Sequence, residues 1–70
     1  MEIPRAPIER IIRKEGAERV SKEAVDALAE YLEDVAKRTA KLAINVSRHT
    51  GRKTVQYEDI KLAQREIEGK

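Results

Sequence analysis

The sequence contains no cysteine, tryptophan or phenylalanine, and it has only one histidine. Without cysteine the chain forms neither a disulfide framework nor a thiolate metal site, and one histidine cannot hold a metal ion alone. We therefore expect no metal and no cofactor. No uncharged stretch approaches the roughly 20 apolar residues of a membrane span, so we expect no contact with a membrane. The charged start lacks the apolar core of a signal peptide, and a cytoplasmic protein is the expectation.

Charge is what the sequence has in abundance. Lysine and arginine number 15, aspartate and glutamate 13, and the formal net charge is +2. Such a balance permits nucleic-acid binding only if the cations gather on one surface. The sequence has no glycine-rich phosphate loop, and every carboxylate fits a helical surface. We therefore expect a protein that is not an enzyme and has no small-molecule substrate.

The hydrophobic core of this chain must be small, because only 40% of its 70 residues are apolar. At this length the free energy from burial roughly balances the entropy lost on ordering the chain. With disulfides and metals excluded, oligomerisation is the remaining means of stabilisation. The chain shows no repeat, linker or low-complexity tail, so we expect a single domain over 1–70.

Proline and glycine divide the sequence into three helical stretches. Ser21 is a good N-cap for the central helix, and Gly51 can take the left-handed conformation that ends it. The expected ranges are about Pro4 to Lys14, from Ser21 as N-cap to His49 or Thr50, and Gln56 or Tyr57 toward Gly69. The fold class is therefore all-α: a short helix, a loop, a long central helix, a loop and a short helix.

The central helix predicts a homodimer. Its 28 or so residues span roughly 42 Å, which exceeds a compact domain of this size. An apolar seam follows one face of the helix throughout and consists of Leu28, Leu32, Val35, Leu42 and Val46. The first four of these residues are the predicted dimer core. Two short helices cannot cover this seam, so two long helices are expected to cross and bury it.

The charges of the central helix indicate the direction of crossing. The stretch 22–34 holds five acids and one base, whereas the bases that follow have no acid among them: Lys37, Arg38, Lys41 and Arg48. Antiparallel partners place unlike halves side by side, and parallel partners stack like charges. We therefore expect antiparallel crossing.

Cations gather on the first helix and in both loops. Arg10, Arg13 and Lys14 lie at i, i+3 and i+4 on a face away from the isoleucines of that helix. Arg19 lies in the first loop, and the second contains Arg52, Lys53 and Thr54. An ordinary solvated surface is the alternative interpretation, because exposed charge often has no specific role. In an antiparallel dimer the first loop of one chain falls beside the second loop of the other.

Four stretches carry a resemblance to a known family: PRAPIERII at 4–12, GAERVS at 16–21, RHTGRKTV at 48–55 and EDI at 58–60. In these stretches the sequence resembles the archaeal histones, and the comparison can be continued from Met1 to about Ile67 without a gap. The resemblance implies the histone fold, a head-to-tail handshake homodimer, and wrapping and compaction of double-stranded DNA on the chromosome without sequence specificity.

The resemblance also implies roles for the loop residues. It places Arg19 in the minor groove with Thr54 as its orienting hydroxyl, and Lys53 on phosphate. Two roles are open for Arg52, which either contacts the DNA backbone or pairs with Asp59 and braces the loop.

Larger assemblies are a further implication of the resemblance. Leu62 lies about 200° around the last helix from Ile60, away from the dimer core. The resemblance gathers four residues into a contact between dimers: Val46, His49, Asp59 and Leu62. Taken alone, His49 fits an exposed position at a helix C-terminus. The resemblance also implies close stacking of DNA turns at Gly16. Our own hypothesis adds ion pairs between stacked dimers, of Glu30 with Lys61 and of Asp34 with Arg65.

Two other functions fit the same sequence. One is a histone-fold or antiparallel-coil module that binds other proteins of a transcription complex, with its basic strip incidental. Such a module would bind DNA weakly, whereas wrapping through many phosphates predicts affinity that falls steeply with salt. Other histone-fold chains, as heterodimer partners, are an expectation alongside the homodimer. Sequence-specific DNA reading ranks last, because no helix has base-reading side chains at suitable spacing.

Overall fold

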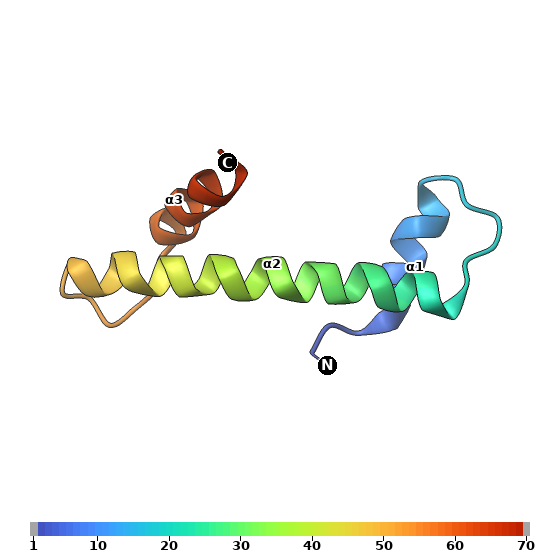
Figure 1. The fold of residues 1–70 in the computed structure, drawn as a ribbon, viewed down its shortest axis with the longest axis horizontal. Helices are drawn as coiled ribbons and strands as arrows, with labels where there is room; N and C mark the ends of the chain where they lie inside the picture. The colour runs from blue at the N-terminus through green and yellow to red at the C-terminus, as the bar shows by residue number, and fades with distance from the viewer. Residues whose placement is uncertain (1, 70) are drawn as a thin grey trace. The chain divides into compact units, whose positions relative to one another are not determined.

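The computed structural model describes residues 2–69 and consists of three α-helices there (Figure 1). Helix α1 spans Arg5–Lys14, α2 spans Lys22–His49 and α3 spans Tyr57–Glu68. The predicted all-α order of short, long and short helices is confirmed, and each end agrees with its predicted position to within one residue. Within the described range, no helix is both long enough and apolar enough to cross a membrane.

The ends of α2 are fixed by the residues expected to fix them. The Ser21 hydroxyl oxygen accepts the backbone N–H of Ala24 at 3.0 Å, and this bond caps the first turn. At the other end Gly51 has a φ of +75°, in the left-handed region that favours glycine. Both ends of α2 are therefore defined by local signals: a side-chain cap at its start and a left-handed glycine just after its end.

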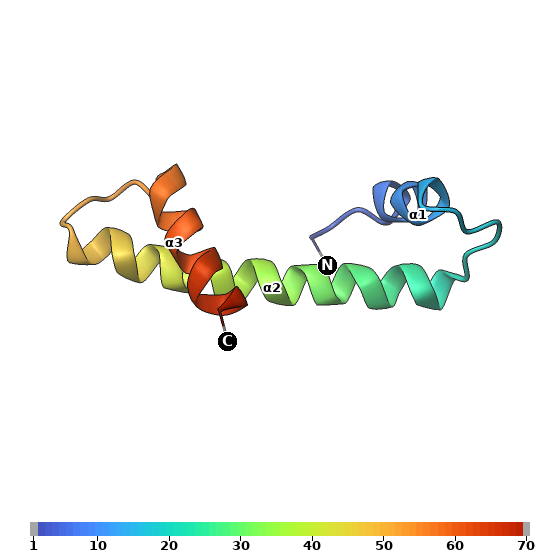
Figure 2. The ribbon, with the colours of Figure 1, turned by 90° about the horizontal axis from the view of Figure 1, so that it is seen from above.

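The chain packs as two units, one ending at Asp34 and the other beginning at Val35, and α2 contributes to both. In the first unit α1 crosses the first turns of α2 at a steep angle (Figures 1 and 2). Its core is formed by Ile8, Val25 and Ala29, with Ile3, Ile12, Val20 and Leu28 packed around them. The single domain over 1–70 stays a prediction.

The N-terminal segment is held on α2 by polar contacts. The Glu33 carboxylate accepts the backbone N–H groups of Glu2 and Ile3, and these two bonds, the first above all, lower the pKa of Glu33. Arg5 donates from Nε to the Asp26 carboxylate at 2.9 Å. These contacts fix the path by which the chain enters α1.

In the second unit α3 lies across the last turns of α2 (Figure 2). The buried residues there are small or polar: Ala43, Ser47, Asp59 and Ala63. Small side chains let the two helices approach closely, and this brings the start of α3 beside the second loop.

The apolar seam of α2 is incompletely covered by the chain's own helices. Leu32 is 36% exposed, and Leu28, Val35 and Leu42 are half-buried. A contiguous row of incompletely covered apolar side chains is typical of an interaction surface. Burial of the seam in a dimer stays a prediction.

Candidate nucleic-acid interface

The first group of predicted DNA-binding residues lies on α1 and the loop that follows. Arg10, Lys14 and Arg19 are exposed. Arg10 and Lys14 stand one turn apart on α1 because residues at i and i+4 share a face. These side chains can contact phosphates without displacing any part of the first unit.

Arg13 belongs to the same strip but is also bound within the chain. Its Nε and Nη2 atoms approach the Glu9 carboxylate at 3.0 and 2.9 Å, and its Nη1 donates to the Glu18 carbonyl oxygen at 3.0 Å. The guanidinium therefore ties the end of α1 to the residue before Arg19. This bracing contact was not predicted, because sequence spacing places Arg13 on a face but does not show which carbonyl lies within its reach.

Gly16 begins the first loop with a φ of +125°, a conformation that other residues rarely adopt. A Cβ added there meets no heavy atom within 4 Å. Backbone conformation alone therefore accounts for glycine at this position, and the predicted close approach between stacked dimers is an additional reason that stays a prediction.

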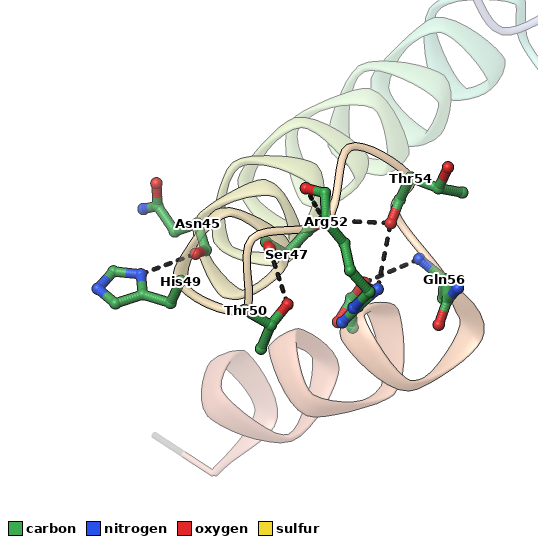
Figure 3. A network of polar contacts seen from close by, with 8 residues as sticks. Asn45, Ser47, His49, Thr50, Arg52, Thr54 and Gln56 are labelled. Atoms are coloured by element: carbon green, nitrogen blue, oxygen red, sulfur yellow. Dashed lines mark hydrogen bonds and ion pairs between the residues drawn. The ribbon is translucent and has the colours of Figure 1, made fainter.

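The second loop is organised by Ser47, a residue without a predicted role. Ser47 lies near the end of α2, is 2% exposed, and donates its hydroxyl toward the carbonyl oxygens of Arg52 and Thr54, each at 3.1 Å (Figure 3). Its own carbonyl accepts the backbone N–H groups of Thr50 and Arg52. One buried serine thus fixes the loop backbone from Thr50 to Thr54.

Arg52 and Asp59 form a two-bond ion pair that joins the loop to α3. Arg52 Nη2 donates to Asp59 Oδ1 at 2.7 Å, and Nη1 donates to Oδ2 at 3.0 Å. Asp59 Oδ2 also accepts the backbone N–H of Gln56 at 2.8 Å. The guanidinium, and next the Gln56 N–H, lowers the pKa of Asp59 below its ordinary value of 3.8, and the pairing raises the pKa of Arg52. Of the two roles left open for Arg52, the chain therefore shows the pairing with Asp59 that braces the loop.

Lys53 and Thr54 are exposed on this fixed loop. The bonds described above hold the backbone on either side of Lys53 and leave its amine at the surface. The loop can therefore present a cation and a hydroxyl to an anionic ligand in one geometry. Arg19 and Thr54 lie in different units, and their pairing across a dimer stays a prediction.

Three of the four residues predicted to join dimers line one groove in the second unit. Its volume is about 380 Å³, and its lining residues are Leu42, Asn45, Val46, His49, Thr50, Leu62, Ala63 and Glu66. Leu62 is 44% exposed, and the exposed His49 places Nδ1 2.9 Å from the Asn45 carbonyl oxygen (Figure 3). The groove is apolar with one imidazole at its edge.

Asp59, the fourth of these residues, differs from expectation. The resemblance implies that Asp59 contacts another dimer, whereas its side chain is only 2% exposed within this chain. The reason is that hydrogen bonds from the Arg52 guanidinium and from the Gln56 backbone N–H hold the carboxylate against the second loop. Its predicted contact with His49 of another dimer stays a prediction.

The four charged residues predicted to pair between stacked dimers are exposed: Glu30, Asp34, Lys61 and Arg65. The two acids belong to the first unit and the two bases to the second. Lys61 stands over the ring of Tyr57, with Nζ 5.7 Å from the ring centroid. Their pairing between dimers stays a prediction.

Comparison with known proteins gives consistent results. Residues 1–63 match the family described as histone-like transcription factor (CBF/NF-Y) and archaeal histone. Among curated proteins, the chain is 60% identical over 62 residues to one of the subunits of archaeal histone HAN1 from Thermococcus zilligii, covering 89% of this chain and 92% of that protein. It is 45% identical over 64 residues to probable archaeal histone 3 of Methanocaldococcus jannaschii, covering 91% and 96%. It is also 39% identical over 59 residues to DNA-binding protein HmvA of the same organism, covering 84% and 62%.

Proposed function

Because the chain belongs to the family of archaeal histones and histone-like transcription factors, and is therefore a histone-fold, DNA-binding chromatin protein, we propose that it wraps and compacts double-stranded DNA without reading its sequence. The working unit is a head-to-tail handshake homodimer, and dimers join into larger assemblies on the chromosome. Its role is structural rather than catalytic.

The observation that carries this function is the second loop, which is fixed from within. Ser47 and the pair of Arg52 and Asp59 hold its backbone, while Lys53 and Thr54 remain exposed. Phosphate contacts position a protein on DNA without reading bases, so they need donors held in a constant geometry. A loop that is already ordered loses little entropy on binding.

In the antiparallel dimer each first loop lies beside a second loop of the other chain. We assign Arg19 to the minor groove, oriented by the Thr54 hydroxyl of the other chain. The other cations contact phosphates: Arg10, Arg13, Lys14 and Lys53. Arg52 has a bracing role, because Asp59 holds its guanidinium.

Dimers join end to end through the groove lined by Val46, His49 and Leu62. A carboxylate has about four acceptor positions, and Arg52 and Gln56 use three of those on Asp59. The remaining position, on Oδ1, is the one that His49 of a neighbouring dimer would use. Ion pairs of Glu30 with Lys61 and of Asp34 with Arg65 add weak support between stacked dimers.

The salt dependence of DNA affinity tests this function. The dissociation constant is measured on several unrelated duplexes between about 50 and 200 mM salt, where six to ten phosphate contacts predict a loss of about 10³ to 10⁵ in affinity. We expect this steep loss with similar affinity for every sequence. A loss below about tenfold contradicts binding through many phosphates.

The roles of Arg19 and Arg52 are separated by DNA bending. R19A should reduce the bending of a short end-labelled duplex, measured by energy transfer at saturating protein, because an arginine in the minor groove fixes the DNA path. R52A should mainly lower stability, since it leaves Asp59 without its partner. Equal or greater loss of bending in folded R52A rejects the assignment.

A protein-binding module of a transcription complex is the second candidate, and the family description, which includes transcription factors, is what favours it. This function predicts weak DNA binding with a shallow salt dependence. It also predicts that the chain prefers another histone-fold protein to a second copy of itself. The salt titration, with sedimentation of the protein alone, therefore distinguishes the two candidates.

A further inference from the structure

The second half of α2 carries three cations that the interface described above does not use. Lys37, Lys41 and Arg48 lie within about 40° of one another around the helix, at 100° per residue. All three are exposed, and within the described part of the chain none of them is in an ion pair. We call this set the α2 basic stripe.

The α2 basic stripe faces away from both surfaces that α2 uses for packing. The seam at Val35, Leu42 and Val46 is centred about 140° around the helix from the stripe. The face of Ala43 and Ser47, which is buried within the second unit, lies about 120° away on the other side. A partner chain on the seam therefore leaves the stripe exposed.

The stripe is continuous with the second loop. Lys41, Ile44, Asn45 and Arg48 line a shallow hollow of about 300 Å³. An adjoining hollow of about 270 Å³ shares Ile44 and Arg48 and extends to the second loop, with these other lining residues: Ser47, Arg52, Lys53 and Val55. Basic side chains thus follow one surface from the middle of α2 to Lys53.

The dimensions and chemistry of this surface suit a nucleic-acid backbone. From Lys37 to Arg48 the helix rises about 16 Å, which corresponds to about five phosphates of one DNA strand. No acidic residue occurs on α2 from Val35 to His49, so the positive potential of the stripe is not offset along its own helix. The Asn45 amide adds a neutral donor at its edge.

We propose that the α2 basic stripe is a further binding surface for the phosphate backbone of double-stranded DNA. It extends the DNA path from Lys53 along α2 toward Lys37. This rests on the proposed function, because the stripe prolongs a DNA contact that begins at the second loop.

The test compares two double variants that each remove two charges from α2. K37Q/K41Q changes the stripe, and K22Q/R38Q changes two cations outside it that none of the proposed DNA contacts uses. Each lysine on phosphate contributes about 1 to the salt slope of DNA affinity. On a duplex that holds one dimer, K37Q/K41Q should lower the slope by about 2 per chain and the affinity at 0.2 M salt by about tenfold or more.

The control K22Q/R38Q should keep the wild-type slope. If both double variants change it equally, general charge loss explains the effect and the stripe is not a DNA surface. If K37Q/K41Q keeps the wild-type slope while K53Q lowers it, the stripe does not bind DNA, and the proposed function stands. If the wild type itself binds without salt dependence, both fail.

Crosslinking gives a second readout that does not depend on affinity. The sequence has no cysteine, so K41C labelled with a photoreactive group carries the label at one position only. K41C should crosslink to DNA, whereas A36C, which is also exposed but lies about 140° around the same helix from Lys41, should do so far less. Crosslinks of K41C to a second protein chain instead of DNA would overturn the inference.

Discussion

Asp59 joins the second loop, whose backbone Ser47 holds, to α3. Its side chain is 2% exposed, and it accepts two hydrogen bonds from Arg52 and one from the Gln56 backbone. A buried carboxylate is tolerated only when such partners satisfy it. Its burial therefore ties the conformation of the loop to the position of α3.

The pH dependence of unfolding tests this role. The folded-state pKa of Asp59 lies below its ordinary value of 3.8. Its contribution to stability is therefore complete above that value and is lost as the pH falls through the lowered pKa. At neutral pH, D59N should unfold at a lower urea concentration than the wild type, because the amide cannot replace the ion pair.

The difference in urea midpoint between D59N and the wild type should shrink as the pH falls below 3.8. Urea midpoints followed by circular dichroism from pH 7 to pH 2 give the comparison, at one protein concentration because dimer stability depends on it. Midpoints that differ equally at every pH would show that the Asp59 carboxylate does not stabilise the fold.

Among the elements, the helices could be predicted from sequence because their ends are set locally. Ser21, Gly51 and the isoleucine spacing of α1 carry their own signals, and the structure agrees with them. The network around Ser47 could not be predicted, since a serine inside a helix has no pattern that reveals which loop carbonyls approach it. The pair of Arg52 with Asp59 was one of two roles left open for Arg52, but residue spacing does not show that this pair buries the carboxylate.

The cap of α2 gives a prediction for one element. Gly51 has a φ of +75°, and an added Cβ meets no heavy atom within 4 Å, so only the backbone conformation opposes a side chain. G51A should lower the free energy of unfolding by about 1 kcal/mol. G51N should lower it less, because asparagine tolerates the left-handed region.

Urea unfolding of the three proteins at equal concentration measures both differences. Equal stability of G51A and the wild type would show that the cap conformation costs nothing for alanine. A larger loss in G51N than in G51A would point instead to contacts of the side chain in the assembled protein.

For the whole molecule, the proposed antiparallel dimer would bring two groups of cations onto one surface. The first unit holds Arg10, Lys14 and Arg19, and the second holds Lys53. Apolar side chains at the seam, such as Leu32 at 36% exposure, remain to be covered by another chain. Periodicity predicts the seam, and its burial against a second chain stays a prediction.

Disulfide crosslinking tests the direction in which the helices cross. In an antiparallel dimer with full overlap, the two copies of Val35 meet near the middle of α2, and the two copies of Lys22 lie about 40 Å apart. V35C should therefore form a disulfide-linked dimer under mild oxidation, and K22C should not. Efficient linking of K22C would require parallel helices.

Nuclease digestion of random-sequence duplex DNA, at several ratios of protein to DNA, tests most directly the proposal that the chain wraps DNA. Because inward-facing minor grooves recur about every 10 base pairs, each added dimer should lengthen the protected fragment by a constant number of such repeats. We expect a ladder of fragments with one step size, lost at high salt. Absence of protection even at low salt would contradict wrapping and favour the protein-binding module.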